Sequence, residues 1–345
     1  MTDPHPPAPT RRVSIEDIAR AGGVSHSTVS RALRDYPLIS AATRERLQAL
    51  AREMGYTPNA VAQSLQRRHT GTIGLVVTSI SDPFFVDVIE GVEEVARSAG
   101  LSIFLNSSHN DPAQEIAVIE NFHRRRVDGV VAAAARSGDR YAARLQRINV
   151  PVILINDQAA ADRHLFHSVA VDDQAGAMLA AGHLLELGHR RIAYLGVSNR
   201  PKSNDRRLAG YRAALASAGV PVCDELIAIA PEELMAAGDV AAGQALGPRL
   251  RDAGATAICC HNDMVAVGVG LTCAVPGDVS VVGFDDNAIA RYVTPPLTTI
   301  AQPKREMGRL AIEMLLALLD GRAVESRVFQ PTLRVRASTA AYSRG

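Results

Sequence analysis

The chain has 345 residues, 47% of them hydrophobic and 21% charged, so it can bury sizeable cores and is long enough for two or three domains. Its net charge of +1 gives no indication of a nucleic-acid, membrane or acidic partner. No apolar run reaches the length of a membrane span, and the Pro-rich start lacks the apolar stretch of a secretory signal. We therefore expect a cytoplasmic protein without membrane contact, with a disordered leader over residues 1–11.

The cysteines do not indicate a disulfide framework or a metal site. Cys223, Cys259, Cys260 and Cys273 include no CxxC pair. This pattern fits buried thiols in a reducing compartment. We expect no metal and no cofactor.

Charge is unevenly spread along the chain. Residues 1–70 hold ten arginines, no lysine and six acidic residues, whereas the remainder holds 27 basic and 30 acidic residues. A basic head on a mildly acidic body suggests that the head meets a polyanion, although a window of this length can drift by a few charges. Up to Leu65 the apolar residues recur only at helical spacing.

The first part of the chain predicts three helices. Ser14 precedes a helix over 15–21, Gly22-Gly23 breaks it, and Ser25 begins a second helix over 26–33. A third helix runs from Ser40 to residue 55.

The second helix has two different faces. Val29, Ala32 and Leu33 face the first helix, whereas short polar side chains, an imidazole and Arg31 lie on the other side. Such a face suits the major groove of DNA, which admits one helix and is read by hydrogen bonds. A generic helical hairpin and a solvated surface histidine at position 26 remain as alternatives.

After the third helix, residues 56–65 predict a short helix followed by Arg67, Arg68 and His69. From Thr72 onward short apolar runs alternate with amphipathic helices, a pattern that builds parallel sheets covered on both faces. The predicted strands are 73–77, 101–105, 129–133, 152–155, 192–195, 257–260 and 279–284, and the helices between them include 85–99, 113–125, 173–187, 206–218 and 237–251.

An enzyme is a poor fit to the remaining motifs. Residues 259–263, Cys-Cys-His-Asn-Asp, offer a thiol, an imidazole and a carboxylate, but neighbouring strand residues point to opposite faces and cannot all converge. The sequence holds no GxSxG elbow and no metal-spaced histidine pair. We expect no catalytic residues.

Taken in order, the motifs resemble the lactose-repressor (LacI/GalR-type) family of bacterial transcription regulators. The resemblance covers nearly the whole chain after the leader. It is carried by IEDIARAGGVSHSTVSRAL (15–33), TRERLQALAREMGY (43–56), PNAVAQSL (58–65), DPFF (82–85), GHLLELGHRRIAYLG (182–196), RRLAGYRAAL (206–215), HND (261–263), VSVVGFDD (279–286) and TPPLTTI (294–300).

The resemblance implies an all-α helix-turn-helix head plus an α/β periplasmic-binding-protein-like core of two Rossmann-like subdomains. The implied domains are a leader over 1–11, the DNA-binding domain over 12–57, a hinge helix and linker over 58–70, and an effector-binding and dimerisation domain over 71–345. Within the core, the N-subdomain would comprise about 71–167 and 298–323, and the C-subdomain about 168–294 and 327–340.

For the head, the resemblance implies that two heads of a homodimer bind a pseudo-palindromic DNA operator. His26 and Ser27 occupy the main base-reading positions and Arg31 a further one. Leu65 would wedge into the central base step, although a leucine that ends a short helix is more often a packing residue. The implied phosphate and hinge contacts are Ser14, Ser25, Thr28, Ser40, Thr43 and Asn59. Arg34 stands where the family often has asparagine.

For the core, polar and aromatic residues follow predicted strands, where ligands bind in open α/β sheets. The resemblance implies that Arg207, Asn262 and Asp285 hydrogen-bond a small polar effector, with a sugar as the base-rate choice. Two phenyl rings would pack against the apolar face of the effector. As alternatives, the two rings could belong to the core, and Asp285 could cap a helix. The candidates are Phe84, Phe85, Asn156, Asp157, Arg207, Asn262 and Asp285.

The resemblance also has departures and open alternatives. Residues 230–235 lack a sugar-stacking aromatic, and the segment 264–276 is short, which predicts a truncated helix. A repressor switched by its effector fits best. A binding or transport module without operator function, or a regulator with a drifted pocket, is the alternative. By resemblance, the helices at 304–320 and 85–97 are the expected dimer surfaces.

Overall fold

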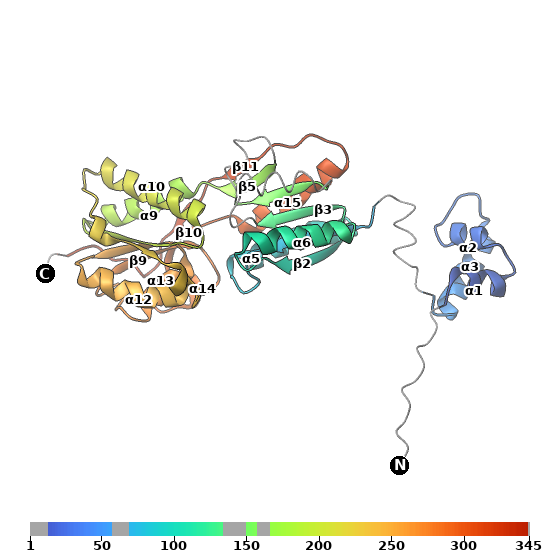
Figure 1. Ribbon diagram of the computed structural model, residues 1–345, viewed down its shortest axis with the longest axis horizontal. Helices are drawn as coiled ribbons and strands as arrows, with labels where there is room; N and C mark the ends of the chain where they lie inside the picture. Colours follow the sequence, from blue (N-terminus) through green and yellow to red (C-terminus); the bar gives the residue numbers. More distant parts are fainter. Residues whose placement is uncertain (1–12, 57–68, 134–149, 157–165, 344–345) are drawn as a thin grey trace, which may run out of the picture. The chain divides into compact units, whose positions relative to one another are not determined.

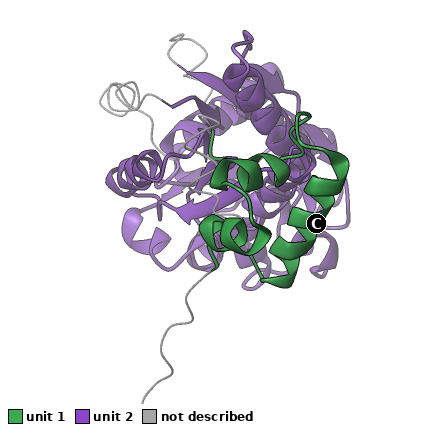
Figure 2. Ribbon diagram, turned by 90° about the vertical axis from the view of Figure 1, so that its right-hand side faces the viewer, with its two compact units in different colours: residues 1–70 green, residues 71–345 purple. Residues whose placement is uncertain are grey.

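The computed structural model describes residues 13–56, 69–133, 150–156 and 166–343. The chain divides into two compact units, residues 1–70, called the head below, and residues 71–345, called the core (Figure 2). The expected leader and the expected hinge helix over 58–65, with Asn59 and Leu65, lie outside the described residues.

The described part of the head contains three helices at the predicted positions: α1 (Ile15–Gly22), α2 (His26–Ala32) and α3 (Ala41–Glu53). Ile18, Val29 and Leu47 are fully buried between them. The Gly-Gly turn permits this packing, because a Cβ at Gly22 would lie 2.8 Å from the Leu47 side chain and Gly23 has a left-handed φ of 65°. The helix-turn-helix prediction is confirmed.

The core contains two six-stranded sheets, each covered by helices. The first sheet is entirely parallel, in the order β11-β5-β4-β3-β1-β2. Its strands are β1 (Thr72–Val77), β2 (Ser102–Ser107), β3 (Gly129–Ala133), β4 (Val152–Ile155), β5 (His167–Val171) and β11 (Arg327–Phe329).

The second sheet has the order β12-β10-β9-β8-β6-β7 and is parallel except for the β10–β12 pair. Its strands are β6 (Ile192–Val197), β7 (Ile227–Ala230), β8 (Ala257–Cys260), β9 (Ser280–Asp285), β10 (Thr298–Ala301) and β12 (Thr332–Arg334). The chain crosses between the sheets three times, after β5, β10 and β11. Two Rossmann-like subdomains are therefore present, as the sequence predicts.

Helices cover both faces of each sheet (Figure 1). On the first sheet, α5 (Phe84–Ser98) and α15 (Lys304–Leu319) cover one face and α6 (Pro112–Arg124) the other. On the second, α9 (Asp173–Glu186) and α10 (Pro201–Ser217) lie opposite α12 (Asp239–Asp252) and α13 (Asp263–Gly270). The short helices are η1 (Asp224–Leu226), α11 (Glu232–Met235) and α14 (Ile289–Tyr292). Within the described ranges, no helix is both long and apolar enough to cross a membrane.

Side chains along β8 alternate between the two faces of the second sheet, and this separates the two cysteines of the motif at 259–263. Cys259 packs with α9 and α10, whereas Cys260 packs with α12 and α13 on the other face. The two thiols therefore do not face one reacting centre, as the strand periodicity predicts.

The subdomain boundaries differ from the expected ones. Residues 168–171 belong to β5 of the first sheet, and residues 298–301 form β10 of the second, each opposite to its expected assignment. Residues 327–329 form β11 and likewise join the first sheet. The reason is that the chain crosses over after these strands and not before them.

The start of α10 and the length of α13 can be compared with the predicted helices. α10 begins at Pro201, five residues earlier than expected, so Arg207 lies in its second turn and not at its start. Proline at the first helical position favours this earlier beginning. The truncated helix predicted in the segment 264–276 is α13, which spans eight residues.

Candidate functional site

The polar residues of the head gather at helix N-termini. Ser14 begins α1 in a capping box with Asp17, whose carboxylate accepts from the Ser14 backbone N–H at 2.9 Å. Ser25 begins α2 and Ser40 begins α3, each accepting from the backbone N–H three residues on, at 3.2 and 3.3 Å. Helix N-termini favour anions, so these ends are suited to DNA phosphates.

α2 presents a polar face at its exposed side. Val29 and Ala32 are buried, whereas His26, Ser27 and Arg31 are exposed. Thr28 and Thr43 are partly buried, and their hydroxyls lie 2.8 Å from the capping serine oxygens. All the predicted head contacts within the described residues therefore lie on α2 or at the helix N-termini.

The effector candidates of the core meet in one cleft between its two sheets. Phe84 and Phe85 begin α5 after β1, Asn156 follows β4, Asn262 follows β8, and Asp285 ends β9. Arg207 joins them from α10. Asp157 lies outside the described residues. The cleft encloses about 80 Å³ of free volume.

Arg207 is anchored at the floor of the cleft. Its Nε donates to Asp173 Oδ1 at 2.8 Å, its Nη1 donates to the His261 carbonyl, and its guanidinium lies 3.6 Å from the centroid of the Phe284 ring. Its Nη2 lies 4.0 Å from Asp285 Oδ1. Two carboxylates and one aromatic face therefore hold a buried cation in the lining of the cleft.

Arg200 spans the mouth of the cleft. Its Nη2 pairs with Asp82 Oδ2 of the first subdomain at 3.0 Å, and its Nη1 pairs with Asp239 of the second at 3.0 Å. Asn262 Nδ2 donates to the same Asp239 carboxylate at 2.6 Å. Arg200 therefore joins the two subdomains directly at the cleft.

The cleft holds several polar atoms without a partner among the described residues. They are three amide oxygens and one imidazole nitrogen, and buried polar groups normally have a partner. They are Asn110 Oδ1, Asn156 Oδ1, His261 Nδ1 and Gln302 Oε1. Burial and the neighbouring Arg207 and Arg200 hold the pKa of His261 well below its usual value, so its ring is neutral. Such a lining suits a ligand rich in O–H or N–H donors.

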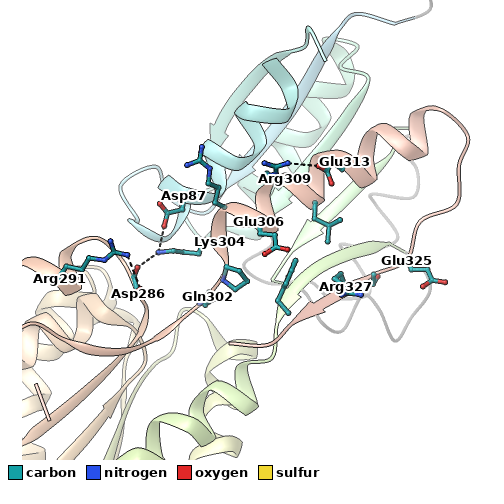
Figure 3. A pocket seen from close by; sticks show the side chains of 15 residues that line it. Asp87, Asp286, Arg291, Gln302, Lys304, Glu306, Arg309, Glu313, Glu325 and Arg327 are labelled. Carbon is teal, nitrogen blue, oxygen red and sulfur yellow. Dashed lines mark hydrogen bonds and ion pairs between the residues drawn. The ribbon is translucent and has the colours of Figure 1, made fainter. Parts of the chain in front are cut away.

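A wider groove of about 960 Å³ lies on the other side of the Gln302–Pro303 crossover (Figure 3). Lys304 Nζ, almost fully buried, donates to Asn287 Oδ1 at 2.7 Å and pairs with Asp87 Oδ2 at 3.0 Å. Lys304 therefore ties α5 and α15 to the loop after β9. The narrower cleft holds the larger share of unpartnered polar atoms and all the described effector candidates, and it is therefore the better ligand site.

Sequence reasoning missed several cleft residues. Asp173 and Gln302 line the cleft and directly contact Arg207 and Asp285, respectively. Each follows a strand, β5 or β10, that the apolar runs did not reveal. Arg200 and Asp82 were also missed, although Asp82 stands within the DPFF motif.

Asp285 gives the core a testable pH dependence. Burial raises the pKa of its carboxyl from 3.8 to about 6. Between these values the folded state binds more protons than the unfolded chain, so the free energy of unfolding falls as pH rises, by up to about 1.4 kcal/mol per pH unit. Asp285→Asn, which keeps an acceptor for Gln302, is expected to remove this part of the slope in urea titrations across the window.

The matched control is Asp252→Asn at an exposed site of α12, which is expected to keep the wild-type slope. A wild-type slope in the Asp285 variant would contradict the prediction. Asp173 and Asp263 also have raised pKa values through burial, so part of the slope remains in every variant.

Comparisons with known proteins agree with this arrangement. Residues 14–59 match the family "Bacterial regulatory proteins, lacI family", and residues 181–339 match "Periplasmic binding protein-like domain". The transcriptional regulator GalR of Escherichia coli K12 is 36% identical over 330 residues, covering 93% of this chain and 94% of GalR.

Two solved structures are similar over nearly the full length. The lac repressor dimer bound to operator and the anti-inducer ONPF has a TM-score of 0.84 at 27% identity, covering 96% of this chain and all of the other. A complex of the regulator CelR with cellobiose has a TM-score of 0.70 at 27% identity, covering 95% and 100%.

Head, core and cleft thus define a helix-turn-helix transcriptional regulator with a periplasmic-binding-protein-like core. With this level of identity over most of its length, the chain belongs to the lacI family of bacterial regulatory proteins. It is a DNA-binding repressor regulated by a small-molecule effector in the core, and like its relatives it is a regulator and not an enzyme.

Proposed function

We propose that this repressor binds a pseudo-palindromic operator as a homodimer in the cytoplasm. The observation that carries the proposal is the exposed polar face of α2, with capped helix N-termini in the same unit. His26, Ser27 and Arg31 lie on this face and read base edges in the major groove. The other contacts position the head on the DNA backbone, since few residues specify sequence while many contact phosphates. The phosphate contacts come from Ser14, Ser25, Thr28, Ser40 and Thr43. Asn59 and Leu65 complete the proposal at the hinge.

The effector is a neutral, donor-rich small molecule such as a sugar. The unpartnered amide oxygens accept hydrogen bonds from its hydroxyl groups, the neutral His261 ring forms a further hydrogen bond, and Arg207 donates to one of its oxygens. Phe84 and Phe85, whose rings meet edge to face, line the apolar side. Cellobiose is bound by one structural relative, which makes sugars the first compounds to try.

The switch follows from the position of the cleft. A ligand there contacts both subdomains, so it changes their relative pose and thereby the state of the segment that leads to the head. Coupling of this kind is typically about 1–3 kcal/mol, or roughly 5–150-fold in affinity.

The test has two parts. The full-length protein is used to select duplexes from a randomised pool, and the selected duplex is then titrated with and without compounds found by thermal-shift screening of sugars, nucleosides and phosphorylated metabolites. We expect one symmetric site and a neutral polyhydroxyl compound that raises the melting temperature and changes DNA affinity. Selection of no sequence would overturn the operator proposal, and the absence of any active compound would overturn the sensor proposal.

The dimer surface follows from the open edge of the first sheet. An apolar groove of about 390 Å³ lies between α5 and the edge strand β2. Its apolar lining, called the β2 groove, consists of Leu75, Ile89, Ala96, Leu101, Ile103 and Leu105. By contrast, the outer face of α15 carries Arg305 and Arg309, paired with Glu94 of α5. A second copy of the chain at the β2 groove covers the apolar side chains, and a relative is a dimer on its operator.

Leu105→Glu is expected to abolish the dimer, because it places a charge in the apolar contact. Leu105 is 40% exposed, so the monomer should fold. Loss of two-headed binding should lower operator affinity by a factor on the order of 10² or more. Sedimentation and DNA titration measure both effects.

The matched control is Val328→Glu, at a side chain 43% exposed on the opposite edge strand β11. It is expected to leave the dimer intact. A dimeric Leu105 variant, or a monomeric Val328 variant, would place the interface elsewhere.

A further inference from the structure

Arg31 lies in the last turn of α2 with its side chain exposed, and its guanidinium lies over an aromatic ring. The Cζ atom is 5.8 Å from the centroid of Tyr36, within the range of a cation–π contact. Within the described residues, no carboxylate forms an ion pair with Arg31. The ring of Tyr36 is thus the group among the described residues that the exposed cation contacts.

Tyr36 lies in a turn that is stabilised by hydrogen bonds to α2 and α3. Asp35 has a left-handed φ of 53°, and the next backbone N–H, that of Tyr36, donates to the Arg31 carbonyl at 3.1 Å. The Asp35 carboxylate accepts from Gln48 Nε2 at 3.0 Å and lies 3.4 Å from Arg44 Nε, both on α3. The turn therefore returns the chain beneath the end of α2 and is fastened to the third helix.

A cation–π contact has a specific consequence for an arginine that reads DNA. A guanidinium that contacts a ring through its flat face keeps its N–H groups free at its edge. Those edge donors are the ones that bond the O6 and N7 atoms of guanine in the major groove. A side chain that already lies on a ring also loses less conformational freedom when it binds.

We propose that Tyr36 is a positioning residue for DNA reading, and that its ring holds the Arg31 guanidinium for contact with the major-groove edge of a guanine. The proposal rests on the base-reading role proposed above for Arg31. Its chemical partner is one G·C pair in each operator half-site. Tyr36 itself makes no base contact and acts through Arg31.

The test uses the full-length dimer and the duplex that the wild type selects from a randomised pool, with a scrambled duplex as the reference. Tyr36→Ala is expected to lower affinity for the selected duplex by about two- to fivefold, the size of an exposed cation–π contact, and to leave the scrambled duplex unchanged. Tyr36→Phe keeps the ring and should bind like the wild type. Adding Tyr36→Ala to Arg31→Ala should cause no further loss.

Each other outcome has a definite meaning. A loss with Tyr36→Phe equal to that with Tyr36→Ala would overturn the proposal in favour of a hydroxyl contact with DNA. An equal loss on the scrambled duplex, or an additive loss in the double variant, would overturn it in favour of a general or direct role. If the wild type selects no sequence, the base-reading function itself fails. If Arg31→Ala alone has no effect, only the reading role of Arg31 and the present proposal fail.

Discussion

Replacing Arg207 by methionine is expected to lower the free energy of unfolding of the core by about 3–5 kcal/mol near pH 8, because breaking a buried pair leaves uncompensated charge. Asp173 and Asp285 would both lose their cation, and the His261 carbonyl would lose a donor. Methionine fills much of the same volume, so the charge change dominates. Effector binding should be lost as well, since Arg207 lines the cleft.

The pH dependence separates this mechanism from simple loss of packing. Without the cation, the pKa values of Asp173 and Asp285 rise further, so both carboxyls take up protons and the deficit shrinks near pH 5. Urea titrations at the two pH values measure the change. Arg212→Gln, on an exposed part of the same helix, is the control and should have little effect. A deficit that is independent of pH would show that packing, and not charge, accounts for the loss.

The head could be predicted from sequence almost completely, because its signals are local. Ser14, Ser25 and Ser40 each accept from an N–H three residues away, and the Gly-Gly turn lies between two periodic apolar stretches. Caps and turns of this kind are set by neighbours in sequence. The contact of Tyr36 with Arg31 was not predicted, because it depends on the left-handed Asp35 and its contacts with α3.

The core could be predicted most accurately where strands are uniformly apolar. β3, β4 and β8 lie at the predicted residues, whereas β10 begins with two threonines that are fully buried. The Thr298 backbone N–H donates to Ser338 Oγ, and the Thr299 hydroxyl donates to Asp263, 40 and 36 residues away. Since such partners are invisible in the local sequence, the strand looks polar.

Because two strands were not predicted, the cleft residues that follow them were not predicted either. Ligands in open α/β sheets lie beyond the carboxyl ends of strands, so an unrecognised strand leaves its following residue unexamined. Asp173 after β5 and Gln302 after β10 were lost in this way. The Arg200–Asp82 pair joins residues 118 positions apart, so no motif spacing could have predicted it. The resemblance supplied Arg207, Asn262 and Asp285 but not the residues that hold them.

Gly308→Ala is expected to destabilise the core by about 1–3 kcal/mol or more, although alanine is the better helix former by about 1 kcal/mol. α5 and α15 pack closely, and a Cβ at Gly308 would overlap the Val88 carbonyl oxygen, just as a Cβ at Gly91 would overlap that of Arg305. Backbone cannot move aside as a flexible side chain can. The steric cost therefore exceeds the gain in helix propensity, and thermal and urea unfolding measure the difference.

The same substitution at Gly182 isolates the steric effect. Gly182 lies inside α9, and an added Cβ there meets nothing within 4 Å, so Gly182→Ala is expected to stabilise by about 0.5–1 kcal/mol. Opposite signs for the two variants would establish the close helix contact, and equal signs would refute it. The contact also has functional consequences: α5 begins with the cleft residue Phe84 and lines the β2 groove, while α15 begins two residues after Gln302. Forcing these helices apart should therefore weaken effector binding and dimerisation together, which titrations of both on the Gly308 variant would measure.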